Sequence, residues 1–217
     1  MTLSPSADSF SPSAAKPPVG AILPKHAAPT GVGFWLRWSG ATGLAFGLTL
    51  LCIEVGEKTD ISLLEAALGG LMVGFAQWQV LRLHLYRAYG WMVATVLAWV
   101  FLTLANIGAV GWMAPSTPSP TLRLIYGVLH GGYAGLVLGS GQWFVLRRQI
   151  PQAWRWIGAS VLIWAIAIAL GWGVGGLLRL ATDLFISDVL GLLLAWGAIA
   201  VLSGISLGLL MHPSRRR

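Results

Sequence analysis

The sequence predicts an all-helical integral membrane protein with six transmembrane helices, and three observations lead to this fold class. Of its 217 residues, 56% are hydrophobic and only 10% are charged, whereas an average soluble domain is about 25% charged. The apolar residues fall in six runs of roughly 20 residues, the length that a helix needs to cross a bilayer core of about 30 Å. No run alternates apolar with polar residues, so a barrel of tilted strands is excluded.

The composition also excludes several other classes of protein. The low charge excludes a soluble globular enzyme and a disordered protein, and the single cysteine, Cys52, excludes a disulfide scaffold. The net charge of +7 does not indicate nucleic-acid binding, because the basic residues lie almost wholly between the apolar runs. We therefore expect membrane lipids to surround the chain and no nucleic acid to bind it.

Residues 1–33 differ from the rest of the chain. They hold six of the eleven prolines and show no apolar period, so alone they are predicted to form a disordered cytoplasmic tail. They lack the basic start, apolar stretch and cleavage site of a signal peptide. The alternative is a segment that becomes ordered along a partner subunit.

The six helices follow in one transmembrane domain, residues 34–212, with a basic C-terminal tail at 213–217. Hydrocarbon cannot satisfy an open N–H or C=O, so helices are the structure that remains for each apolar run. The predicted spans are 34–53, 62–81, 89–112, 122–146, 154–177 and 189–211.

Lysine and arginine set the predicted orientation, since cytoplasmic flanks are enriched in both. With six spans, one side of the membrane carries eleven of the fourteen basic residues and the other side three. We therefore expect a multi-pass protein with both termini cytoplasmic. The eleven are Lys16, Lys25, Arg37, Arg82, Arg87, Arg147, Arg148, Arg155, Arg215, Arg216 and Arg217, and the three are Lys58, Arg123 and Arg179.

The sequence also repeats itself at an offset of 65 residues. Residues 70–82, GLMVGFAQWQVLR, match residues 135–147, GLVLGSGQWFVLR, and the match continues without a gap through Trp91/Trp156 and Trp99/Trp164. Two copies of one helical hairpin are predicted, over about 62–112 and 122–177. Both copies enter the membrane from the same side, so the repeat is parallel.

A third, eroded copy is expected from the last and the first helices. The offset carries Gly139 to Gly204, but it carries Gln142 to Leu207. The first helix resembles the odd-numbered helices through Trp35 and Trp38, with a different spacing. These features favour three hairpins around a pseudo-threefold axis.

One motif of small and polar residues stands in both clear copies. Gly135, Gly139 and Gln142 fall within about 60° on a helical wheel, and the preceding copy has the same arrangement. Glycines let a second helix approach closely, and glutamine then bonds across to it. We therefore interpret the motif as structural. Its tryptophan would anchor the helix at the membrane interface, and its arginine would mark the cytoplasmic end of the span. The alternative is that two amides bind a carbonyl or polar headgroup. The residues are Gly70, Gly74, Gln77, Trp78, Arg82, Gly135, Gly139, Gln142, Trp143 and Arg147.

His130 is the ionisable residue inside a predicted span that deserves a functional hypothesis. On the wheel it points away from the Gly/Gln face. It is either a neutral histidine bonded to a carbonyl or the outer interface, or an axial ligand of a tetrapyrrole metal. Asn106 is expected to make an interhelical hydrogen bond inside the third helix. No cofactor is assigned with certainty; a chlorophyll-type pigment, a carotenoid or a lipid is the candidate class, and no metal ion is predicted.

The repeated Gly-x-x-x-Gly-x-x-Gln-Trp-x-Val-Leu-Arg helix, followed by a helix that starts with tryptophan, resembles a loose group of small polytopic proteins of cyanobacteria and other phototrophic bacteria. The resemblance covers roughly residues 62–211. It implies a location in photosynthetic membranes, that is, a bacterial inner membrane or a thylakoid membrane, and it implies no activity.

No nucleotide loop, metal-binding pair, nucleophile elbow or buried carboxylate pair occurs in the sequence. The functional hypothesis is therefore a non-catalytic accessory or scaffold subunit of a larger membrane complex, which meets other subunits through its transmembrane surface and residues 1–33. The alternatives are a small carrier or channel for a neutral or lipid-like solute, and a pigment- or quinone-binding protein that uses His130. A carrier needs a polar or hollow centre, whereas a scaffold needs glycine faces packed shut.

Overall fold

A computed structural model describes residues 31–53, 61–108, 111 and 114–211. Over these ranges the chain forms six α-helices and no strand, which confirms the all-helical prediction with six helices. Residues 1–30 of the predicted N-terminal tail lie outside the described residues. The predicted C-terminal tail, 213–217, also lies outside them. The helices are α1 (Val32–Cys52), α2 (Leu63–Leu81), α3 (Tyr89–Leu104), α4 (Pro120–Leu146), α5 (Arg155–Thr182) and α6 (Ile186–Met211).

By length and composition, two of the described helices could cross a membrane. These are α5 and α6, and α3 is apolar but shorter. Of the six described helices, these two meet the length and hydropathy that a membrane span requires.

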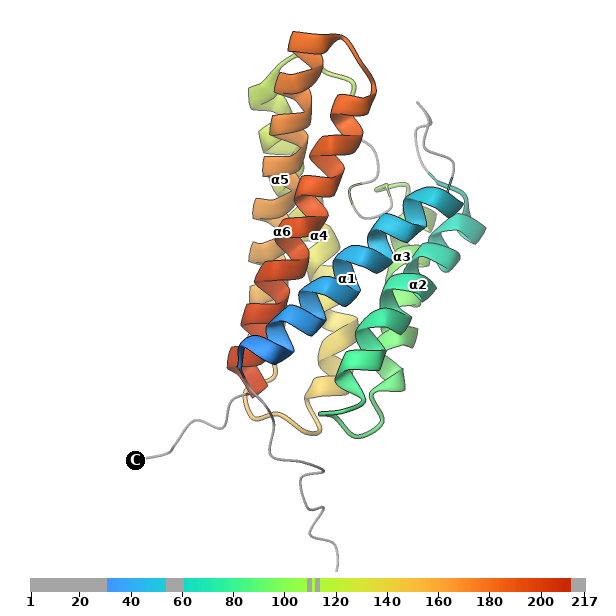
Figure 1. Ribbon diagram of the computed structural model, residues 1–217, viewed down its shortest axis with the longest axis vertical. Helices are drawn as coiled ribbons and strands as arrows, with labels where there is room; N and C mark the ends of the chain where they lie inside the picture. The colour runs from blue at the N-terminus through green and yellow to red at the C-terminus, as the bar shows by residue number, and fades with distance from the viewer. Residues whose placement is uncertain (1–30, 54–60, 109–110, 112–113, 212–217) are drawn as a thin grey trace, which may run out of the picture.

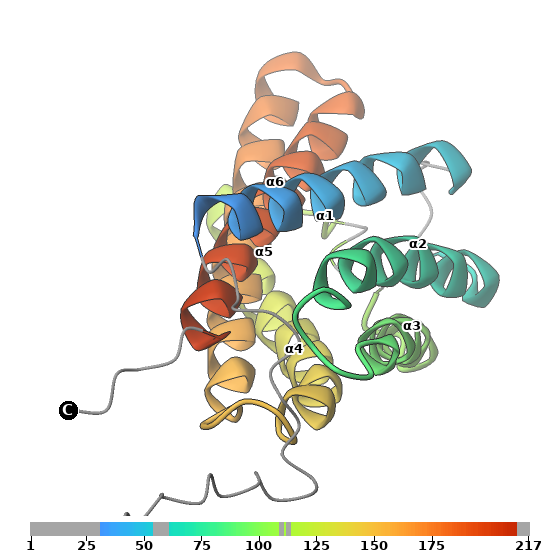
Figure 2. The ribbon, with the colours of Figure 1, turned by 60° about the horizontal axis from the view of Figure 1, so that its bottom comes forward.

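Each helix packs against its neighbours in the chain, and α6 closes the arrangement by packing against α1. Among the described residues, no other pair of helices brings its backbones close together. Successive helices run in opposite directions, so α1 begins and α6 ends at the same end of the bundle (Figure 1). Figure 2, with this end turned forward, shows the helices following one another around a common centre.

The third helix ends earlier than the sequence prediction of 89–112. The amide of Ile107 donates to the carbonyl of Leu102 and the amide of Asn106 donates to Thr103, which is the hydrogen-bond pattern of a Schellman C-cap. Asn106 has a φ of 52°, the left-handed conformation that this cap requires and that asparagine tolerates. The prediction that Asn106 lies inside a helix is therefore wrong, because this residue ends α3.

Glycine brings the helices of each hairpin close together. On α4, Gly127, Gly131, Gly135 and Gly139 all lie against α5, and a Cβ atom at Gly135 would stand 2.5 Å from the carbonyl oxygen of Ser160. On α2, Gly70 and Gly74 lie against the α3 backbone in the same way, 3.0 Å from Val96 Cα and 3.1 Å from Met92 Cα by the same measure. Backbone contact at this range is possible only without a side chain.

These contacts predict opposite effects of alanine at two glycines of α4. Gly135→Ala should lower the free energy of unfolding by about 1–3 kcal/mol, because the new methyl group overlaps the α5 backbone. Gly132→Ala is the matched control, since a Cβ there meets no atom within 4 Å. The control should be neutral or stabilising by up to about 1 kcal/mol, the helix-propensity gain. Thermal unfolding in detergent measures both, and equal effects would contradict the packing.

Candidate functional site

Gln142 joins three helices at the centre of the bundle. Its Oε1 atom, on α4, accepts a hydrogen bond of 3.0 Å from the indole Nε1 of Trp156 on α5. Its Nε2 atom donates to the hydroxyl of Thr95 on α3 at 3.3 Å. The Thr95 hydroxyl in turn donates to the carbonyl of Trp91 at 2.9 Å. One buried amide therefore fixes the position of α4 relative to the helices on both sides.

Gln77 makes the corresponding contacts on α2. Its Oε1 atom accepts from Trp91 Nε1 of α3 at 2.8 Å, and its Nε2 atom donates to the hydroxyl of Thr42 of α1 at 3.3 Å. Gln77 and Gln142, which are 65 residues apart, thus hold the same kind of partners. We call each set of indole, amide and hydroxyl an amide bridge.

At the contact between α6 and α1 the bridge is reduced. The indole of Trp38 donates to Ser203 Oγ at 2.8 Å, while the buried Leu207 occupies the glutamine position of the repeat. Gly204 lies against Trp38, as Gly74 and Gly139 lie against α3 and α5. The tryptophan and the glycine contact are therefore present here, and serine replaces the amide as acceptor.

The sequence analysis missed the hydroxyl and indole partners, although a signal for them exists. A tryptophan, a hydroxyl residue and an aromatic residue recur four positions apart on α1, α3 and α5. This spacing places all three on one helix face. The offset is 53 residues between α1 and α3 and 65 between α3 and α5, so a search at 65 alone does not align α1. The sets are Trp38, Thr42 and Phe46; Trp91, Thr95 and Trp99; and Trp156, Ser160 and Trp164.

Trp196 of α6 fills the middle of the bundle. Its ring stacks on Phe46 with centroids 4.1 Å apart and 6° between the planes. It also packs against Trp99 at 5.7 Å and Trp164 at 5.3 Å. Thus Trp196 contacts the last member of each set, the aromatic residue that follows the hydroxyl residue on α1, α3 and α5. The repeat places Ala66 and Gly131 at the corresponding positions, where small side chains leave room for one indole.

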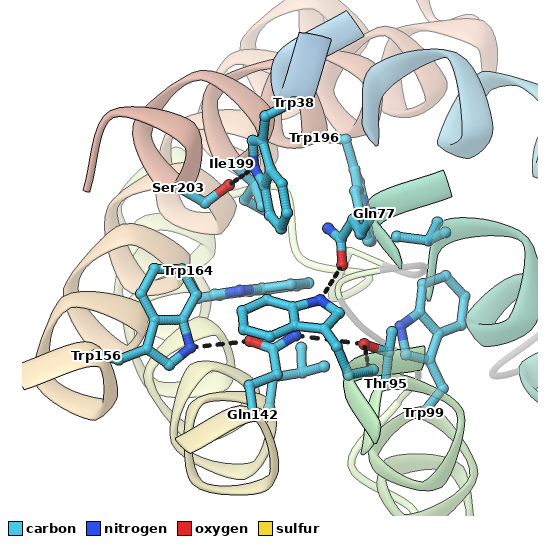
Figure 3. A pocket seen from close by; sticks show the side chains of 13 residues that line it. Trp38, Gln77, Thr95, Trp99, Gln142, Trp156, Trp164, Trp196, Ile199 and Ser203 are labelled. Atoms are coloured by element: carbon cyan, nitrogen blue, oxygen red, sulfur yellow. Dashed lines mark hydrogen bonds between the residues drawn. The ribbon is translucent and has the colours of Figure 1, made fainter. Parts of the chain in front are cut away.

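A small cavity of about 30 Å³ remains beside this tryptophan, and we call it the axial cavity. Side chains from all six helices line it, six of them tryptophans and none charged (Figure 3). Its polar lining comes from the amide bridges and from Ser203. The space at the centre of the described bundle is thus small, with room for little more than water.

The remaining motif residues lie at the end of the bundle where α1 begins. The guanidinium carbon of Arg82 stands 5.4 Å from the ring centroid of Trp78, and that of Arg147 stands 5.0 Å from Trp143. Neither pair reaches the axial cavity. These four residues therefore form two matching cation–π pairs, one on each copy of the repeat.

His130 lies apart from the axial cavity. Its Nε2 atom accepts a hydrogen bond of 2.9 Å from the amide of Gly111, and its ring packs against Trp172 at 4.9 Å. A metal bound at Nε2 would have to displace the Gly111 amide. Within 31–53, 61–108, 111 and 114–211, no three His, Cys, Asp or Glu side chains are grouped so that they could hold a metal ion.

An ion-pair cluster, which the sequence analysis did not anticipate, stands at the opposite end of the bundle. Asp188 bonds Arg123 and Arg179 through its two carboxylate oxygens, each at 2.6 Å. Arg123 is buried and also donates to the carbonyl of Thr117 at 3.0 Å. The cluster ties the beginning of α4 to α5 and α6.

Comparison with protein-family models, with curated proteins and with solved structures finds no match to this chain. The similarity that the sequence does show is within the chain itself. Residues 70–82 match residues 135–147, and α1 and α3 share the spacing of a tryptophan, a hydroxyl residue and an aromatic residue.

The reduced third bridge predicts a rescue experiment. Ser203→Val should lower the free energy of unfolding by about 1–3 kcal/mol, because it leaves the buried Trp38 indole without an acceptor. Adding Leu207→Gln should recover most of that loss, since an amide at this position would take the role of Gln77 and Gln142. Leu146→Gln, at an equally buried leucine, is the control and should not rescue. Thermal unfolding in detergent measures all three, and failure of the double variant to recover would show that the third hairpin is not equivalent.

Proposed function

We propose that this chain is a non-catalytic subunit of a larger membrane assembly, with six helices that span the bilayer as three hairpins around a pseudo-threefold axis. The observation that supports it most is the distribution of side chains, because large apolar residues cover the outward faces as well as the interior. The outward faces are apolar, and the inward polar groups bond to one another around a closed centre. The resemblance noted from the sequence favours photosynthetic membranes as the location.

Large apolar side chains face outward along every helix. On α5, Leu162 is 64% exposed although it stands at the middle of an apolar run. Soluble monomers rarely expose continuous apolar patches larger than a few hundred Å², so lipid is the environment that fits this surface. Examples are Leu44, Leu48 and Leu51 on α1; Leu64, Leu68 and Phe75 on α2; Val93, Leu97 and Phe101 on α3; Leu129 and Leu136 on α4; Ile166 and Leu170 on α5; and Leu194 and Ile205 on α6.

The charges of the described residues favour a cytoplasmic position for the end where α1 begins. Six arginines stand at this end, whereas Arg123 and Arg179 stand at the other end and both pair with Asp188. Such a bias is the usual signature of the cytoplasmic side. The six are Arg37, Arg82, Arg87, Arg147, Arg148 and Arg155.

The closed centre favours a subunit over a carrier. A solute path along the axis would have to pass Trp196 and the aromatic residues around it, and the axial cavity measures only about 30 Å³. The bond between His130 and Gly111 likewise favours a structural role for this histidine over pigment ligation.

Reporter fusions test the membrane topology. Fusions after Arg217 and within residues 54–60 should report opposite sides of the membrane, with Arg217 on the cytoplasmic side, because five further spans separate the two positions. A reporter pair that is active on each side, such as phosphatase and fluorescent protein, gives a positive signal for both. Two fusions on the same side would end the six-span proposal.

Purification of the full chain and of a variant that lacks residues 1–30 tests the role as a subunit. In mild detergent the full chain should run as part of an assembly with other membrane subunits in fixed proportion, measured by light scattering and mass spectrometry. The truncated chain should keep the same melting temperature, because the described bundle begins at α1, but less of it should be recovered with its partners. A full chain that runs as a monomer without partners, unaffected by truncation, would contradict the proposal and favour a carrier.

A further inference from the structure

Two of the tryptophans that line the axial cavity have buried indole N–H groups with no acceptor. Trp99 is 0% exposed and Trp196 is 2% exposed, and Nε1 of each has no hydrogen-bond partner within the described ranges. Both side chains border the cavity (Figure 3). Buried polar groups in proteins are nearly always bonded, and an exception indicates a ligand or a water.

Three of the other indoles at the centre are satisfied. Trp91 and Trp156 donate to glutamine oxygens, and Trp38 donates to Ser203. The two unpaired donors therefore do not reflect a general shortage of acceptors at the centre. They stand together, with ring centroids 5.7 Å apart, beside a cavity that all six helices line.

The chemistry and the size of the cavity select its occupant. The occupant must accept hydrogen bonds from two indoles. An anion would lie there without a counter-charge, because no lining residue is charged, and burial of an unpaired charge is strongly unfavourable. A neutral molecule can also donate to the glutamine oxygens, each of which has a second lone pair. A volume of about 30 Å³ admits roughly two water molecules, since one water needs about 10–15 Å³ by this measure.

We propose that the axial cavity is a binding site for one or two water molecules, which accept hydrogen bonds from the indole N–H groups of Trp99 and Trp196. The bound water completes the hydrogen bonding of the polar centre and fills the space that the reduced third bridge leaves. The site depends on the interior of the bundle alone and holds whether or not the chain is a subunit of an assembly.

Nuclear magnetic resonance of the full chain with ¹⁵N-labelled indoles tests the site. In detergent micelles, the Nε1–H signals of Trp99 and Trp196 should show direct cross-peaks to water with the sign expected for a residence time longer than about a nanosecond. Trp172 is the matched control, because it is buried and donates to the carbonyl of Gly111 at 3.2 Å. It does not line the axial cavity. Its indole should show no such cross-peak. The Trp99→Phe and Trp196→Phe variants assign the two signals.

Val73→Leu provides a second variant that keeps both indoles. Val73 lines the cavity, and the added methylene group should displace water and abolish both cross-peaks. Absence of water cross-peaks at either indole in the unmodified chain would overturn the proposal. A saturable shift of both indole signals on titration with sodium chloride would also overturn it, since the occupant would then be an anion.

Discussion

The amide bridge is the interaction on which the arrangement of the helices depends. Each of the two glutamines accepts from an indole on the following helix and donates to a hydroxyl on the preceding one. A helix that slid or rotated would break both bonds and leave buried polar groups without these partners, which is costly in an interior of low dielectric constant. Hydrogen bonds between membrane helices average only about 0.6 kcal/mol, so the bridges act mainly on register. The glycine contacts supply the close approach that brings the partners within hydrogen-bond distance.

The repeat explains why the centre is closed and also why it is asymmetric. Three aromatic residues, one from each odd-numbered helix, leave space for a single large side chain between them. Trp196 occupies that space, while the corresponding Ala66 and Gly131 are small. Replacement of the third glutamine by Leu207 and the use of Ser203 as acceptor are further departures from the repeat. The α6 side chain that fills the middle therefore departs from the repeat that relates α2 to α4.

The sequence predicts the number of helices well, because the length of an apolar run is a local property. The glycines that it places on one face of α2 and of α4 lie against α3 and α5. It predicts the end of α3 poorly. Apolar residues continue past Leu104, and the decisive feature is the left-handed conformation of Asn106. The partners of Gln77 and Gln142 also escape prediction from one offset, because the segment between α1 and α3 is shorter than that between α3 and α5. The positions that correspond to Trp196 in the repeat hold the small residues Ala66 and Gly131. No repeated pattern therefore predicts that a tryptophan lies at the centre.

A double-mutant cycle between Gln142→Leu and Trp156→Phe tests the central claim, that the amide bridge couples adjacent helices, most directly. The free energy of unfolding of the two single variants and the double variant would be measured in the same detergent. The account predicts a coupling energy of about 0.6–1.7 kcal/mol, the range for such bonds between membrane helices. A parallel cycle with Trp172→Phe, whose indole bonds Gly111, should be additive within about 0.5 kcal/mol. Additivity in both cycles would contradict the claim that the amide bridge couples adjacent helices.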